Sequence, residues 1–159
     1  MIKVGDRLPN IDFYTMTGDG KQKMASDVIF AGRKVVLFAV PGAFTPTCHM
    51  NQLPGFIAAA EAIKAKGVDT IACTSVNDVH VMSAWGRAAG ADGKVLMLAD
   101  GNGEFARAVG LARDYADAGM GERSRRYSMI VVDGVVRELN IEEKPGVAVS
   151  GAETILTQI

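Results

Sequence analysis

Short apolar runs alternate with longer segments of helical period through the first half of the chain. Residues 35–40 and 68–76 are apolar and rich in β-branched side chains, which is typical of strands buried on both faces. Between them, residues 47–66 repeat apolar side chains near a 3.6-residue period and stop at Gly67, which predicts a helix. Pro54-Gly55 predicts a kink near the start of that helix.

The same alternation continues beyond residue 76. Residues 79–89 predict a helix capped by Asn77-Asp78, residues 95–98 a third strand, and residues 103–109 a short helix. Residues 110–123 contain three glycines and show no clear period, so we predict a long loop there.

The end of the chain predicts a hairpin and a closing helix. Residues 127–132 and 135–139 flank Asp133-Gly134, and this pair of residues suits the type I′ turn of a tight hairpin. Residues 152–158 predict the last helix.

The order of these elements predicts an α/β fold of the thioredoxin-like class. We expect a single domain over residues 1–159, with an extra N-terminal segment and a central mixed sheet that is mostly parallel and covered by helices on both faces. A flavodoxin-like sheet is the alternative, and the hairpin near the end disfavours it because it breaks the parallel alternation.

Composition and charge narrow the classes of function. The 159 residues include 17 Lys and Arg against 18 Asp and Glu, with no basic block, so we expect no nucleic-acid or membrane partner. The first residues lack the apolar core of a signal peptide, and two cysteines are too few for a disulfide scaffold. We therefore expect a cytoplasmic protein whose thiols are reduced.

The strongest candidate for chemistry is Cys48, which follows a predicted strand and begins a predicted helix. The free N–H groups and the dipole at the start of a helix stabilise a thiolate there, and the thiolate is the nucleophilic form of cysteine. Thr45 can turn its hydroxyl toward the same sulfur, and Pro41 keeps the mouth of the pocket apolar. Arg126, which opens a strand, is the best candidate for a cation at the site.

Other interpretations of these residues are weaker. A Cys–His acyl-transfer enzyme would need a distant histidine, and only His80 is available; the spacing of Cys48, His49, Cys73 and His80 is not that of a zinc site. Alternation places Cys73 inside a strand, as a core thiol. We predict no metal and no cofactor.

Residues 41–48 (Pro-Gly-Ala-Phe-Thr-Pro-Thr-Cys), followed by Leu53-Pro54-Gly55-Phe56, resemble the active-site signature of peroxiredoxins. More narrowly, the chain is similar to the peroxiredoxin 5 subfamily, which includes plant type II and bacterial glutaredoxin-linked members. The further matches are Ile2-Lys3-Val4-Gly5-Asp6, Ser75-Val76-Asn77-Asp78, Trp85-Gly86-Arg87, Leu98-Ala99-Asp100 and Arg126-Tyr127-Ser128-Met129.

The resemblance implies a thiol peroxidase that reduces hydrogen peroxide and alkyl hydroperoxides through a sulfenic acid on Cys48. By the same resemblance, Thr45 orients the peroxide, and Arg126 activates sulfur and peroxide together. Pro41 and Gly42 belong to the substrate pocket, and Arg87 is a supporting cation. A peroxide-responsive redox sensor or holdase remains the alternative.

The resemblance also implies partners. An external thiol recycles the enzyme, with glutathione and glutaredoxin favoured and thioredoxin as the competing reductant. Relatives form homodimers around the active-site loop, so we expect Phe44 and residues 79–85 to lie in such an interface.

The chain departs from the family pattern at three positions. Val149 occupies the place of the resolving cysteine of animal relatives, Gln52 that of a common histidine, and His49 that of a common serine. His49 either tunes Cys48 or only caps the helix surface, and the second is favoured. With no resolving cysteine, we expect a one-cysteine cycle in which residues 47–53 fray to admit the external thiol.

Overall fold

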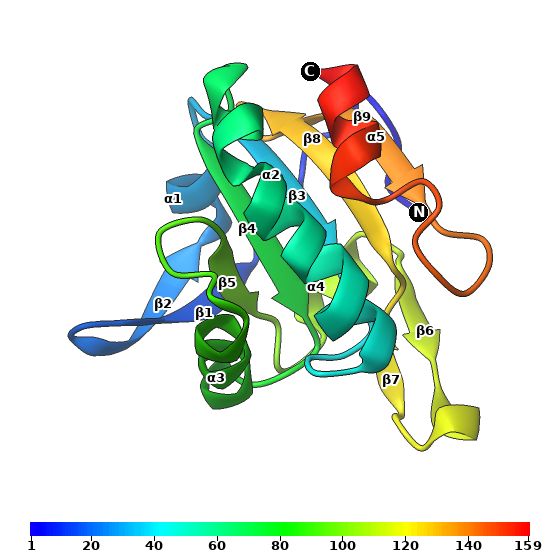
Figure 1. Ribbon diagram of the computed structural model, residues 1–159. Coiled ribbons are helices and arrows are strands. Elements are labelled where there is room, and N and C mark those ends of the chain that lie inside the picture. Colours follow the sequence, from blue (N-terminus) through cyan, green and yellow to red (C-terminus); the bar gives the residue numbers. More distant parts are fainter.

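A seven-stranded sheet runs through the middle of the molecule in the computed structural model, which describes residues 1–159 (Figure 1). Its strands lie in the order β2-β1-β5-β4-β3-β8-β9. Their bounds are β1 Asp12–Thr17, β2 Gly20–Ala25, β3 Lys34–Ala39, β4 Thr70–Ser75, β5 Leu96–Ala99, β8 Tyr127–Val132 and β9 Val135–Ile141.

The sheet is mixed, as predicted, but it is not mostly parallel. Only the central strands β3, β4 and β5 pair in parallel, whereas β1 pairs antiparallel with β5 and β8 pairs antiparallel with β3. The N-terminal hairpin β1–β2, whose strands the sequence did not resolve, adds the remaining antiparallel edge.

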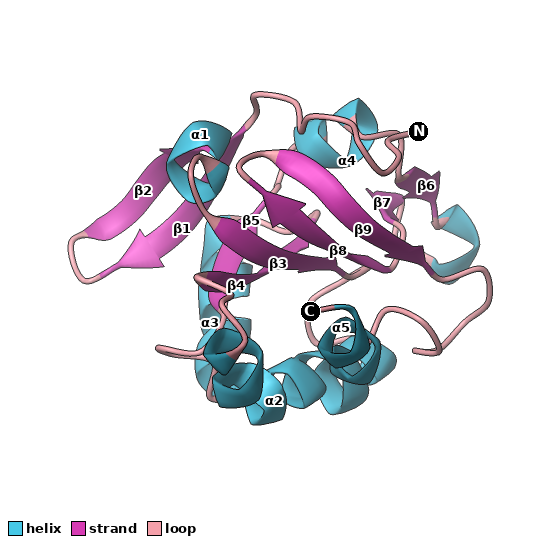
Figure 2. Cartoon of the chain, turned by 90° about the horizontal axis from the view of Figure 1, so that it is seen from above, coloured by secondary structure: helices cyan, strands magenta, loops and turns pink.

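Helices cover both faces of the sheet (Figure 2). The helices α2 (Leu53–Ala65), α3 (Val79–Ala89) and α5 (Ala152–Gln158) lie on one face, and α1 (Ser26–Phe30) and α4 (Glu104–Ala108) lie on the other. Successive side chains of β3 point to opposite faces, so Val36 and Phe38 pack in one apolar cluster and Val35 and Leu37 in the other. A strand buried on both faces accounts for the uninterrupted apolar run in the sequence.

The segment 110–123, predicted as a loop, contains a second small sheet. It is formed by β6 (Ala112–Asp114) and β7 (Glu122–Ser124), which pair antiparallel around the 3₁₀ turn Ala116–Ala118. Most of these residues are exposed, so the strands need no alternation of apolar and polar side chains, and the sequence lacks that signal.

The hairpin β8–β9 was predicted correctly, with its turn. Asp133 and Gly134 have φ values of 48° and 78°, and the type I′ turn requires positive φ at both central residues.

The helix that carries Cys48 begins at Pro46, and its early part is irregular, although not as predicted. The irregularity is a π-helical turn over Cys48–Gln52, before Pro54 rather than a kink at it. The N–H of Leu53 donates to the carbonyl of Cys48, five residues back. Pro54 has no N–H to donate in the next position, and the wider turn accommodates this loss. None of the helices reaches the length and apolarity needed to cross a lipid bilayer.

Candidate active site

The topology of the sheet brings three distant segments to one edge. The parallel strands β3 and β4 both end there, and the antiparallel strand β8 begins there, with Tyr127 opposite Ala39. The loop after β3, the helix start that carries Cys48, and Arg126 before β8 therefore meet at the carboxyl end of the central strands.

Two donors converge on the sulfur of Cys48. The Thr45 hydroxyl lies 2.8 Å from Sγ, and Arg126 Nη2 lies 3.2 Å from it. The Cys48 side chain is fully buried, so these contacts act away from bulk water, where charge-assisted hydrogen bonds are strong. The arrangement stabilises negative charge on this sulfur and leaves it able to act as a nucleophile.

A tight turn in the loop after β3 sets the position of Thr45. Phe44 adopts φ 63°, an uncommon conformation for a large side chain. The Gly42 carbonyl accepts hydrogen bonds from the Thr45 amide at 3.4 Å and from its hydroxyl at 2.7 Å. A Cβ on Gly42 would lie 2.9 Å from Met120 Cε, so Gly42 serves as a tightly packed turn residue. Pro41, partly exposed, lines the cavity outside the thiol together with Thr47 and Arg126.

Asn77 anchors this loop to the end of β4. Its side-chain oxygen accepts hydrogen bonds from the Ala43 amide at 3.0 Å and the Ser75 hydroxyl at 2.7 Å. The sequence favoured Asn77-Asp78 as a helix cap, and Asp78 alone performs that role by accepting from two amides of α3. Nothing in the local pattern indicated the second contact of Asn77, because its partner lies 34 positions away.

Gln52, whose role the sequence left open, hydrogen-bonds to Arg126 and so helps to position its guanidinium. Arg126 Nη1 donates to Gln52 Oε1 at 2.6 Å, while Nη2 of the same guanidinium faces Cys48. The Gln52 amide nitrogen in turn lies 3.2 Å from both the carbonyl and the hydroxyl of Ser150. Gln52 is only 1% exposed, so these partners satisfy a polar group that would otherwise be costly to bury.

Glu142 closes this chain of contacts. Its carboxylate accepts from the amides of Ala148, Val149 and Ser150 at 2.8–2.9 Å and from the Ser150 hydroxyl at 2.6 Å. Burial alone would raise the pKa of Glu142, but these four hydrogen bonds hold it below its ordinary value. A charged, fully bonded carboxylate therefore orders the loop that supports Gln52.

Cys73 lies in the core, as the alternation predicted. It is fully buried in β4, and both cysteines are free thiols. Burial, reinforced by the nearby Cys48, raises the pKa of Cys73 well above its ordinary value, although Arg126 opposes this shift. Cys73 therefore stays protonated at neutral pH and is a poor nucleophile.

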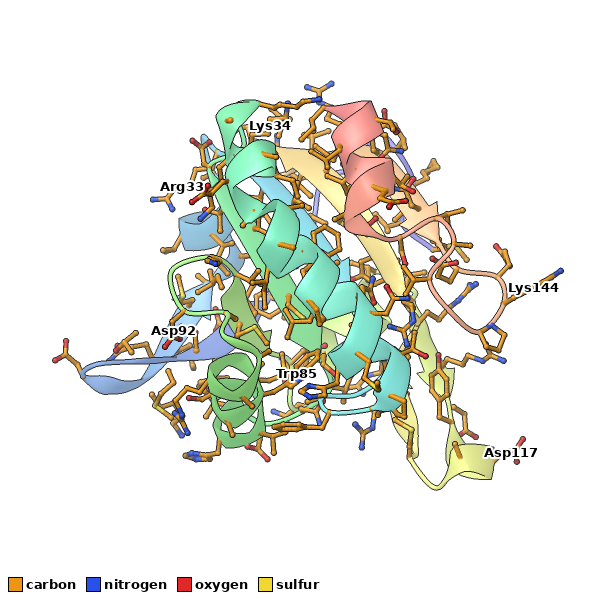
Figure 3. All side chains as sticks on the ribbon, in the orientation of Figure 1. Arg33, Lys34, Trp85, Asp92, Asp117 and Lys144 are labelled. Carbon is orange, nitrogen blue, oxygen red and sulfur yellow. The ribbon has the colours of Figure 1, made fainter.

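Two further residues singled out in the sequence do not touch the sulfur. Arg87 is exposed on α3 and donates to Ser83 at 2.9 Å; no hydrogen bond joins it to Cys48 or Arg126, so its role as a supporting cation stays a prediction. His49 accepts at Nδ1 from the Trp85 indole at 3.0 Å, and Figure 3 shows Trp85 lying between α3 and the helix that carries Cys48. His49 thus fastens the start of this helix to α3.

Neither a Cys–His pair nor a metal centre forms around these residues. His80 is exposed near the start of α3, where its amide is capped by Asp78, and it does not hydrogen-bond to Cys48. The structure gathers no three His, Cys, Asp or Glu side chains that could hold a metal ion.

Comparisons with known proteins point to a single family. Residues 3–156 match the Redoxin family model. The chain is 51% identical to the rice protein peroxiredoxin-2E-2, chloroplastic, covering 98% of this chain and 71% of that protein. The structure of reduced Prx3 from Vibrio vulnificus in complex with hydrogen peroxide is 51% identical, has a TM-score of 0.96, and the match covers 99% of each chain. Peroxiredoxin 5 from Alvinella pompejana is 35% identical over the full length of both chains, with a TM-score of 0.86.

Proposed function

Because this chain belongs to the peroxiredoxins, in the group of the type II and peroxiredoxin 5 proteins, it is a thiol peroxidase with a thioredoxin-like fold, and we propose that peroxide oxidises Cys48. The observation that carries the proposal is the pair of donors on one buried sulfur, the Thr45 hydroxyl at 2.8 Å and the Arg126 guanidinium at 3.2 Å. No comparable donors surround Cys73, the only other cysteine.

In the proposed step, the Cys48 thiolate attacks the nearer oxygen of the peroxide. An S–O bond forms and the O–O bond breaks, so the sulfur is oxidised to a sulfenic acid and the peroxide is reduced. The second oxygen leaves with the electron pair, takes a proton from solvent and departs as water or an alcohol. Thr45 and Arg126, which already donate to the sulfur, donate to the negative charge as it moves onto oxygen.

We propose hydrogen peroxide and alkyl hydroperoxides as substrates, and glutathione with glutaredoxin as the reducing system. The support for an external thiol is the absence of a suitable second one in this chain. Cys73 is buried and protonated, and Val149 stands where animal relatives have a resolving cysteine. The first thiol condenses with the sulfenic acid, forming a mixed disulfide and water, and a second thiol reduces that disulfide to restore Cys48.

Steady-state peroxidase assays with glutathione plus glutaredoxin and with thioredoxin, run side by side, test this proposal. Cys48→Ser should abolish turnover with both reductants, whereas Cys73→Ser should keep most activity with glutathione and glutaredoxin. Mass spectrometry after peroxide and glutathione should find one glutathione, on Cys48. A Cys48–Cys73 disulfide, with loss of turnover in Cys73→Ser, would refute the one-cysteine cycle.

A further inference from the structure

A cavity of about 310 Å³ adjoins the reactive sulfur and is lined by an excess of cations. We call it the basic pocket and define it by Arg113, Arg125, Arg126 and Lys144, with Pro41 and Thr47 at its inner end. It lies between the hairpin β6–β7 and the loop that joins β9 to α5, which run along the same side of the molecule in Figure 1. Its volume is at the lower end of the range of about 300–1,000 Å³ for small-molecule sites.

The acidic residues of this pocket do not neutralise its cations. Glu142 is turned to the amides of residues 148–150, which satisfy it. Glu143 pairs with Arg125 at 3.6 Å, but its side chain is 83% exposed, so this pair contributes little. Arg113 and Lys144 have no carboxylate within 4.0 Å; Arg113 only lies over the Tyr115 ring, at 5.4 Å.

The inner end of the basic pocket lies next to the reactive Cys48. Arg126 lines the pocket and also donates to Cys48 Sγ at 3.2 Å, and Thr47 directly precedes Cys48. A molecule in the pocket therefore lies beside the turn that must open to release the oxidised sulfur. The two free cations, on β6 and on the β9–α5 loop, line the same cavity.

We propose that the basic pocket binds the carboxylates of an anionic peptide thiol of the glutathione class while its sulfur reduces Cys48. This inference rests on the proposed function, since it concerns the reductant of the same site. Hydrogen peroxide and simple alkyl hydroperoxides are neutral, so unpaired cations would not attract them by charge. Glutathione carries two carboxylates, which arginine and lysine recognise by charge and hydrogen bonding.

In the proposed step, the bound thiol attacks the sulfenic sulfur of Cys48. The S–S bond of a mixed disulfide forms, the S–O bond breaks and water leaves. A second thiol then breaks the mixed disulfide, which returns Cys48 to the thiol and releases the disulfide of the reductant. No metal or further oxidant enters this balance.

The test is a comparison of thiols that differ in charge. The double variant Arg113→Gln/Lys144→Gln is oxidised with peroxide, and its reduction is then followed with glutathione (anionic), 2-mercaptoethanol (neutral) and cysteamine (cationic). Trp85, the single tryptophan, contacts His49 next to Cys48 and supplies the fluorescence signal. We expect the second-order rate constant for glutathione to fall about tenfold, with the neutral thiol unchanged and cysteamine no slower.

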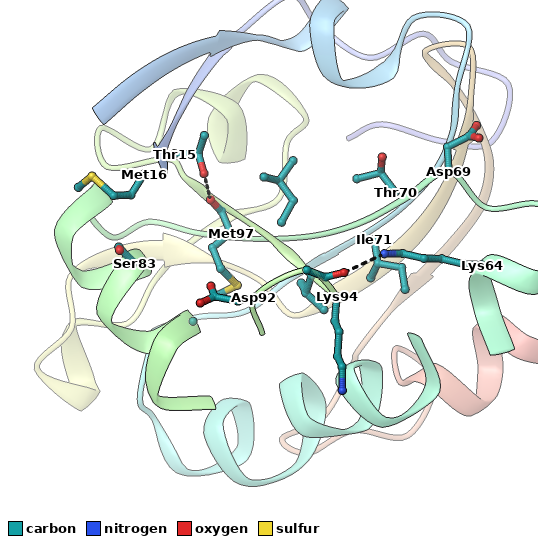
Figure 4. A pocket seen from close by; sticks show the side chains of 14 residues that line it. Thr15, Met16, Lys64, Asp69, Thr70, Ile71, Ser83, Asp92, Lys94 and Met97 are labelled. Atoms are coloured by element: carbon teal, nitrogen blue, oxygen red, sulfur yellow. Dashed lines mark hydrogen bonds between the residues drawn. The ribbon is translucent and has the colours of Figure 1, made fainter. Parts of the chain in front are cut away.

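The matched control, Arg33→Gln/Lys94→Gln, removes the same charges elsewhere. Both side chains are exposed, and Figure 3 shows Arg33 and Lys144 at opposite sides of the molecule. Lys94 lines a separate cavity of about 400 Å³, shown in Figure 4, which none of the residues bonded to Cys48 lines. This control should reduce at the wild-type rate with all three thiols.

The remaining outcomes separate the two proposals. Reduction of the Arg113→Gln/Lys144→Gln variant by glutathione at the wild-type rate overturns the assignment of the basic pocket, even if Cys48 reacts normally with peroxide. A slower reaction with a carboxylate-bearing hydroperoxide, with glutathione unaffected, would assign the pocket to the substrate and also overturn it. If Cys48 of the wild type does not react with peroxide at all, the proposed function itself fails.

Discussion

The Thr45 hydroxyl carries one proton but lies within hydrogen-bonding distance of two acceptors, Cys48 Sγ at 2.8 Å and Gly42 O at 2.7 Å. It donates to whichever acceptor has the greater negative charge. A thiolate draws this proton toward the sulfur, whereas a neutral sulfur releases it to the carbonyl. The hydroxyl can therefore follow the charge through the reaction without any movement of the backbone.

Replacing Thr45 tests this role. Thr45→Val keeps the shape of the side chain but removes the donor, and we expect oxidation of Cys48 by hydrogen peroxide to slow by about 10²–10³. Thr45→Ser keeps the hydroxyl and should remain within about tenfold of the wild type. Stopped-flow fluorescence measures both, and an unchanged rate in Thr45→Val would remove the hydroxyl from the mechanism.

Gln52 is expected to act through Arg126 as a positioning residue. Gln52→Leu removes the acceptor of Arg126 Nη1, and a hydrogen bond to a charged group is worth about 1.5–3 kcal/mol, so peroxide oxidation should slow by about tenfold or more. Gln52→His supplies a ring nitrogen as acceptor and should restore most of the rate. Thermal unfolding of both variants separates this effect from a loss of stability: a slow Gln52→His variant of normal stability would contradict the role.

The residues that touch the sulfur could be predicted from the sequence, and those behind them could not. Cys48 and Thr45 stand three positions apart in one motif, and Arg126 directly precedes a strand whose direction follows from the hairpin. The contact of Gln52 with Ser150 spans 98 positions, and it depends on how the last loop packs against the helix start. No local pattern of charge or hydrophobicity encodes such a contact.

At the scale of elements, the loop between β9 and α5 depends on one carboxylate. Glu142 has a pKa below its ordinary value of 4.5, so the folded state binds its proton less readily than the unfolded state. Its contribution to stability is therefore complete above pH 4.5 and is lost as the pH falls through the lowered pKa.

Glu142→Gln should remove this dependence. We expect the free energy of unfolding of this variant at neutral pH, measured by denaturant titration, to be about 1–3 kcal/mol lower than that of the wild type, because four donors lose a charged acceptor. Its free energy of unfolding should then fall less steeply than that of the wild type below pH 4.5. The exposed neighbour Glu143 gives the control, since Glu143→Gln should match the wild type in both respects. Parallel pH curves for wild type and Glu142→Gln would contradict the assignment.

Elements with a strong local signal were predicted nearly to the residue, whereas weak ones were missed. The β8–β9 hairpin has a turn sequence that allows few alternatives, and the closing helix has the bounds that the sequence predicts. The strands β6 and β7 are three residues each, and only Ser124 among them is buried, so burial left no pattern in their sequence. The parallel part of the sheet is smaller than predicted, because the N-terminal hairpin, which the sequence did not resolve, adds two antiparallel strands at one edge.

At the scale of the whole molecule, we propose that the face around Phe44 pairs with a second copy of this chain. Phe44 is 47% exposed and Met50 78% exposed, which is unusual for large apolar side chains beside a reactive site. The Phe44 ring lies 5.6 Å from the His49 ring and 6.4 Å from that of the buried Trp85, so the exposed ring packs against the contact that joins this helix to α3.

Light scattering at micromolar concentration should therefore give the mass of a dimer. Phe44→Asn should shift the protein toward the monomer. It should not unfold the chain, because asparagine tolerates the positive φ at this position. Val28→Asn, on α1 of the opposite face, removes an apolar side chain that is 58% exposed and should leave the dimer intact. A wild-type monomer would overturn the proposal.

The wide turn at Cys48–Gln52 has a mechanical consequence for this enzyme. In a continuous α-helix, gaining or losing one residue rotates everything beyond it by about 100°. Here the wide turn ends where α2 begins, so we expect Phe56, Ala60 and Ile63 to keep their rotational phase against the sheet when the turn before them opens. The structural change that exposes the sulfur would then be confined to a single turn. We therefore expect Cys48 to move without disturbing the packing of the core.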